Sequence, residues 1–130
     1  RQLLDLVDRD RARAGLPPLL RDARLAADAR SYSREMAETG DVAHISQRTG
    51  SVVDRVRAAG VAPPPTTLAE NVASAVSAAE AEQAFMGSPG HRDNVLSRQV
   101  THVGVGVAVG RAEGPTVPLY FTQIFAGWQQ

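Results

Sequence analysis

Three residues of this sequence could together bind a metal or carry out acid–base chemistry: His44, Glu70 and His91. Imidazole and carboxylate groups are ligands for zinc, and they are also the commonest general acids and bases in enzymes. The three residues lie far apart in the chain. Any shared chemistry therefore requires a fold that brings their segments together.

Local sequence leaves the roles of His44 and Glu70 open. The His44 imidazole could be a metal ligand, a general base or a half-buried hydrogen-bonding group. Glu70 has apolar neighbours on both sides, which predicts burial, and a buried carboxylate must be paired or hydrogen-bonded. It could therefore hold a histidine or cap backbone N–H groups, or act as a ligand or as a general base with a raised pKa.

The segment from Ser88 to Leu96 predicts a helix that begins with a serine N-cap and a proline at the first position. His91 would lie in its first turn, where the helix dipole lowers the pKa of an imidazole and favours the neutral, ligand-competent form. The alternative is an exposed histidine at a helix start. Ser88 is not expected to be a nucleophile, because a Gly-x-Ser-x-Gly elbow is missing and a capping hydroxyl already bonds backbone N–H groups.

The elements that must position these residues are predicted to be helices first and strands last. Leu25, Ala29, Tyr32 and Met36 form one apolar stripe of a helix that begins after Asp22 and ends at Gly40. Further helices are predicted near residues 3–15, after capping boxes at Ser51/Asp54 and Ser77/Glu80, and after Ser88; residues 68–73 are ambiguous between strand and buried turn, and strands are predicted at 103–109 and 119–125.

The pattern of the strand predicted at residues 103–109 also indicates how the layers pack. Valines alternate with Gly104, Gly106 and Ala108, which predicts a strand with a small face that admits close packing of a helix. The order of elements favours an α+β fold in which helices pack on a small antiparallel sheet.

Composition excludes several classes of protein. The chain has 130 residues, 14 basic and 14 acidic, with 43% hydrophobic residues and no cysteine. One soluble domain, residues 1–130, is expected, without disulfides, thiolate metal sites or cysteine nucleophiles. The near-zero net charge argues against nucleic acid as a partner, and no apolar run is long enough for a transmembrane segment. The chain begins with Arg1, which we interpret as a trimmed form that has lost any signal peptide.

In their order and spacing these segments resemble the CAP (SCP-like) superfamily, and most closely its cysteine-free bacterial branch. The resemblance rests on an opening helix that ends at Leu16-Pro17-Pro18, the segment Ala69-Glu70-Asn71-Val72, the run from Phe85 to Leu96, and the final Tyr120–Phe125. It implies an α-β-α sandwich with a central antiparallel sheet flanked by helices, and an extracellular or cell-envelope location.

The resemblance also implies a cleft that, in many members, holds a divalent metal such as zinc between two histidines and two acidic residues. His44, Glu70 and His91 match three of these positions, and Ser88 falls where the second carboxylate would be, so a weak three-ligand site is implied. Ser88 and Asn71 are expected to line the cleft. CAP domains share no single reaction, so the name does not decide the function.

Three functions remain open on this basis. The first is a binding module for a small-molecule, lipid or cell-wall ligand, with a weak divalent-metal site and no enzymatic activity. The second is a lipid or sterol carrier. The third is a metal-assisted hydrolase of peptide or cell-wall material, in which Glu70 is the third ligand or the general base for bound water.

Overall fold

The computed structural model describes residues 1–129, which form five helices and four strands. The helices are α1 (Gln2–Arg13), α2 (Ala23–Thr39), α3 (Val52–Ala58), α4 (Ala78–Met86) and α5 (Pro89–Val95). The strands are β1 (Leu20–Arg21), β2 (Thr67–Ala75), β3 (His102–Val109) and β4 (Leu119–Gly127).

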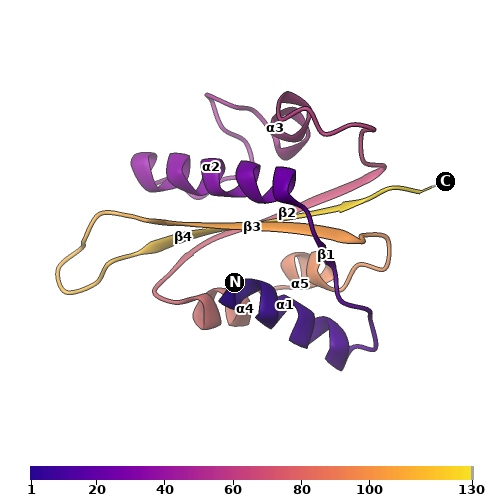
Figure 1. The fold of residues 1–130 in the computed structure, drawn as a ribbon. Helices are drawn as coiled ribbons and strands as arrows, with labels where there is room; N and C mark the ends of the chain where they lie inside the picture. The colour runs from indigo at the N-terminus through magenta and orange to yellow at the C-terminus, as the bar shows by residue number, and fades with distance from the viewer. Residues whose placement is uncertain (130) are drawn as a thin grey trace.

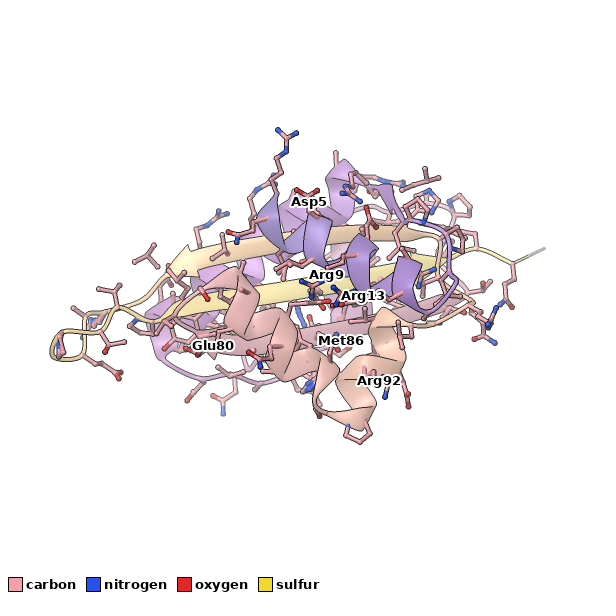
Figure 2. All side chains as sticks on the ribbon, turned by 90° about the horizontal axis from the view of Figure 1, so that it is seen from below. Asp5, Arg9, Arg13, Glu80, Met86 and Arg92 are labelled. Carbon is pink, nitrogen blue, oxygen red and sulfur yellow. The ribbon has the colours of Figure 1, made fainter. Side chains whose placement is uncertain are left out.

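The strands form one sheet in the order β1-β3-β4-β2, with helices on both faces. α2 and α3 cover one face, and α1, α4 and α5 cover the other (Figure 1). Figure 2 shows this second layer from outside. The predicted α-β-α sandwich is thus confirmed, with β2 and β3 both antiparallel to β4. β1 pairs in parallel with β3 and was not predicted, because two residues are too few to show a periodicity.

Each face of the sheet carries its own apolar core, and β4 contributes to both. Ile124 packs with Leu25 and Ala29 of α2, whereas Phe125 packs with Val7 of α1. Successive residues of a strand point to opposite faces of the sheet, so neighbouring apolar residues of β4 are buried in different cores. This explains why β4 is almost continuously apolar.

Helix α2 begins and ends where the sequence predicts. The Asp22 carboxylate accepts hydrogen bonds from the backbone N–H groups of Arg24 and Leu25, at 2.8 and 3.1 Å. Gly40 ends the helix with a left-handed backbone, φ 75°, which glycine adopts without steric penalty.

The small face of β3 accepts α2, as predicted. A Cβ atom added to Gly104 would lie 2.2 Å from the backbone nitrogen of Ala26, and one added to Gly106 would lie 2.3 Å from that of Arg30. Such distances are far below van der Waals contact. The glycines therefore let the helix backbone rest directly on the strand.

The predicted caps at Ser88 and Ser77 lack some of the expected hydrogen bonds, whereas the one at Ser51 is complete. Ser88 occupies the N-cap position of α5 with φ −115° and ψ 122°, which suits a cap, but its hydroxyl makes no capping hydrogen bond. The expectation that this hydroxyl is engaged with backbone N–H groups was therefore wrong. Ser77 accepts from the N–H of Glu80, whereas Ser51 and Asp54 form the complete reciprocal capping box.

Candidate functional site

The fold brings His44 and Glu70 into contact. Glu70 lies in β2, and His44 lies in the loop that follows α2. Oε1 of Glu70 is 3.1 Å from Nδ1 of His44. The Glu70 side chain is 1% exposed and that of His44 is 55% exposed, so the carboxyl group is buried and the imidazole ring lies on the surface. The contact through Nδ1 leaves Nε2 on the opposite side of the ring.

Arg55 of α3 binds the other oxygen of Glu70. Its Nη1 and Nη2 atoms donate to Oε2 at 3.0 and 2.7 Å, and Nη2 also donates to the carbonyl of His44 at 3.3 Å. The guanidinium carbon lies 3.5 Å from the centre of the Tyr32 ring, a cation–π contact. The hydroxyl of Tyr32 donates to the carbonyl of Ala43. These contacts tie α2, α3, β2 and the His44 loop together around one carboxyl group.

Opposing effects act on the protonation of Glu70. Burial raises the pKa of its carboxyl group above the usual value, and the positive charge of Arg55 and the bond from His44 offset only part of that rise. The partners at both oxygens are nitrogen groups, and charge-assisted bonds from a guanidinium are among the strongest in proteins. With Glu70 ionised, His44 donates through Nδ1–H, and Nε2 keeps a free lone pair.

His91 lies beside His44, in the first turn of α5. The two imidazole centroids are 6.4 Å apart, and the ring of Phe85 meets His91 edge-on at 5.4 Å. Burial lowers the pKa of His91, and the charge of His44 lowers it further. The direction is the one expected from the sequence, but the causes here are burial and the neighbouring imidazole.

Side-chain amides join the two backbone segments that carry Glu70 and His91, β2 and α5. Asn94 of α5 donates to Oδ1 of Asn71 at 2.9 Å and to the carbonyl of Glu70 at 3.3 Å. Asn71 donates to Gln123 at 2.9 Å, and Gln123 donates to Glu82 at 2.9 Å. Asn71, Gln123 and Glu82 are each 0% exposed. The chain of bonds therefore crosses the interior from β2 through β4 to α4.

Ser88 and Asn71 lie at different depths. Ser88 is half-buried at the start of α5. Asn71 is fully buried, and its side-chain amide donates to the carbonyl of His91 at 3.1 Å. Asn71 thus fixes the first turn of α5 through the backbone of His91.

Sequence reasoning missed Arg55 and Gln123. Arg55 lies three residues after Val52 and directly before Val56, which helical spacing places on the buried side of α3. Gln123 lies inside an apolar strand. A charged or amide side chain at a buried position requires a polar partner, and that requirement was the available signal.

The residues of the site fit a metal ion better through imidazole than through carboxylate. Both oxygens of Glu70 already have nitrogen partners, and a cation at this carboxylate would lie next to the Arg55 guanidinium. Within residues 1–129, no group of three His, Cys, Asp or Glu side chains is arranged to hold a metal ion. Of the side chains at the site, the imidazoles of His44 and His91 are the ones whose chemistry suits a metal ion.

A comparison with protein families identifies the chain. The model of CAP, the cysteine-rich secretory protein family, matches residues 4–125. The chain belongs to the CAP family. The match covers β2, α5 and the loop of His44, and so includes every residue of the site described above.

Several bacterial proteins resemble this CAP domain in sequence or in fold. The protein YkwD of Bacillus subtilis (strain 168) is 34% identical over 107 residues, 82% of this chain and 41% of the relative. An extracellular protein containing an SCP domain from Bacillus anthracis str. Ames is 30% identical, with a TM-score of 0.83 over 97% of this chain and 39% of that one. An outer surface protein of Borrelia burgdorferi, 16% identical, shares the fold with a TM-score of 0.78 over 98% of this chain and 90% of its own.

The CAP domain spans less than half the length of its two Bacillus relatives. Among residues 1–129, no helix has both the length and the apolar character needed to cross a bilayer.

Proposed function

We propose that this CAP domain is an extracellular or cell-envelope binding module whose ligand contacts the paired imidazoles of His44 and His91. The supporting observation is the bond between Nδ1 of His44 and Glu70, which leaves Nε2 free on an exposed ring beside His91. The Bacillus anthracis relative, which is described as an extracellular protein, supports the location.

A divalent metal, zinc by preference, is the ligand that two adjacent imidazoles suit best. His44 and His91 would hold it, and Glu70 would orient His44 by accepting from Nδ1–H, as carboxylates commonly do behind ligating histidines. With two protein ligands the affinity would be low. The bound ion would offer open positions to a further ligand.

Zinc calorimetry tests the proposal. The His44→Ala/His91→Ala double variant should lose binding. Glu70→Gln should weaken binding by about 10- to 100-fold, because the amide orients the ring less strongly. His102→Ala is the matched control: this third histidine bonds Thr101 at the start of β3, so its loss should leave zinc affinity unchanged. Full affinity in the double variant would contradict the proposal.

A metal-assisted hydrolase of peptide or cell-wall material is the second candidate, and the His44–Glu70 contact favours it. Nitrogen groups face both Glu70 oxygens, so in this candidate His44 and His91 would hold the ion, Glu70 would position His44 through Nδ1, and the ion would lower the pKa of a bound water. Metal-dependent turnover of peptidoglycan fragments that is lost in His44→Ala and reduced in Glu70→Gln would favour this candidate. Saturable lipid binding that a chelator leaves unchanged would instead favour the lipid or sterol carrier.

A further inference from the structure

The outer edge of β3 has no partner over most of its length. β1 pairs only with His102 and Val103, whereas β3 continues to Val109. The carbonyl of Val103 accepts from the N–H of Asp22 at 3.0 Å, on the side of β1. Backbone groups alternate between the two edges of an antiparallel strand, so Val105 and Val107 direct their N–H and C=O groups to the same outer edge. Within residues 1–129 these groups make no hydrogen bond.

Helices α1 and α2 leave a groove along this edge. The groove has a volume of about 770 Å³ and is lined by residues 103–107 of β3. Ala23, Ala26 and Arg30 of α2 form one side, and residues 1–4 form the other. Because five consecutive strand residues line it, the groove follows the strand edge itself. Figure 1 shows β3 running between α2 above and α1 below.

The exposed side chains that β3 itself presents along this edge are apolar. Val107 is 52% exposed and Val109 is 68% exposed, and Val76, also in the groove, is 52% exposed. Native proteins usually block exposed edges with charged side chains, prolines or bulges. Beyond His102, β3 contains only valine, glycine and alanine. An open edge of this kind can accept an extended peptide as an additional strand.

Charge along the rim favours an acidic occupant. Arg30 lines the groove, and Arg34 lies one turn further along α2, beside Val107 and Val109. Both arginines are exposed, and within the described chain neither forms an ion pair. Free guanidinium groups attract carboxylates. They also oppose edge-to-edge pairing of two copies of this chain, because the arginines of each copy would approach those of the other.

We propose that the outer edge of β3 binds an extended acidic segment of a partner protein, which adds to the sheet beside Val105 and Val107. Side chains of the added strand would alternate between the two faces. Those on the α2 side would meet Arg30 and Arg34, and those on the α1 side would meet the apolar groove around Leu3 and Val76. The segment would therefore alternate acidic and small apolar residues. This inference does not depend on the His44–His91 site.

The test uses the full 130-residue chain and a labelled peptide of about eight residues that alternates valine and glutamate. Fluorescence anisotropy should show saturable binding, and Arg30→Glu should weaken it about tenfold or more. A peptide with lysine in place of glutamate should prefer the Arg30→Glu variant. Arg57→Glu, an exposed arginine on α3, is the matched control and should leave binding unchanged.

The backbone part of the proposal has its own test. Val107→Pro removes an outward N–H without touching the pairing with β4, and proline is tolerated at such edge positions. It should abolish peptide binding. If this variant does not fold, a peptide N-methylated at alternate residues gives the equivalent test, since only one of the two methylation patterns should abolish binding.

Three outcomes would overturn the proposal. The first is a dissociation constant above about 1 mM, or binding that neither Val107→Pro nor N-methylation reduces. The second is binding of oleate but not peptide, lost in Arg30→Glu, which would make the groove a lipid site. The third is a dimer in sedimentation that Val107→Pro dissociates, which would make the occupant a second copy.

Discussion

Arg55 donates two hydrogen bonds to a single oxygen of Glu70, at 3.0 and 2.7 Å, and the side chains of both residues are almost fully buried. A buried ion pair persists only when its geometry offsets the loss of water from both charges. Here the guanidinium also stacks on Tyr32 and donates to the carbonyl of His44. The pair thus fixes the carboxyl group that orients His44, and it links stability to the site.

Removing Arg55 should therefore destabilise the domain. Arg55→Met leaves Glu70 as a buried carboxylate without its cation, and we expect a loss of about 3–5 kcal/mol in the free energy of unfolding, measured by urea denaturation. Arg57→Met, an exposed position on the same helix, should change it by less than about 0.5 kcal/mol. Equal effects of the two variants would show that the Arg55–Glu70 pair contributes nothing.

Glu82 should make stability depend on pH. It is fully buried, and burial together with the neighbouring carboxyl group of Asp10 raises its pKa to about 8. The folded chain thus holds this proton more tightly than the unfolded chain, whose carboxyl has its usual pKa of 4.5. The stabilisation is complete below pH 4.5 and is lost as the pH rises to about 8.

Glu82→Gln should remove that pH dependence, because the amide stays neutral and still accepts from Gln123. Urea denaturation at several pH values between these limits would measure the slope. Glu80→Gln is the matched control, since Glu80 lies on the outer surface of the same helix (Figure 2). A wild-type slope retained in Glu82→Gln would place the titrating group elsewhere.

The pKa of His91 should respond to His44. Burial lowers it from the usual value of 6.5, and the charge of His44 adds to the shift. In His44→Ala the pKa of His91 should therefore rise part of the way, since burial remains. A proton NMR titration of the imidazole signals would measure it, with His102→Ala as control. An unchanged or lower pKa would contradict the coupling.

The sign of the linked stability follows from that shift. Because the folded state favours neutral His91, its contribution is present above pH 6.5 and is lost as the pH falls through the lowered pKa.

Gly104 should be intolerant of even one added carbon. Its Cβ would lie 2.2 Å from the backbone nitrogen of Ala26, so α2 would have to move away from the sheet. We expect Gly104→Ala to lower stability by about 1–3 kcal/mol in thermal unfolding followed by circular dichroism. A Cβ atom added to Gly90 would meet no atom within 4 Å, so Gly90→Ala should be neutral or slightly stabilising in its helix. A neutral Gly104→Ala would mean that the helix is not held against β3.

Much of the architecture was predictable because its signals are local. Asp22 and Gly40 define the ends of α2 through capping and a left-handed backbone, which are properties of single residues. The alternation of valine with glycine in β3 predicts a small face, and α2 occupies it. Residues 68–73 were ambiguous because their pattern alone does not distinguish a strand from a buried turn. Pairing with β4 decides it.

The candidate site was likewise predictable in part. The sequence alone singled out His44, Glu70 and His91, since imidazoles and a carboxylate among apolar neighbours are rare and chemically informative. Only the tertiary structure decided that Arg55 holds one oxygen of Glu70 while His44 meets the other, that Asn71 bonds the backbone of His91, and that β3 has an open edge. These relationships join residues that are distant in the chain, and distances across a fold depend on how whole helices and strands pack, which no local pattern records.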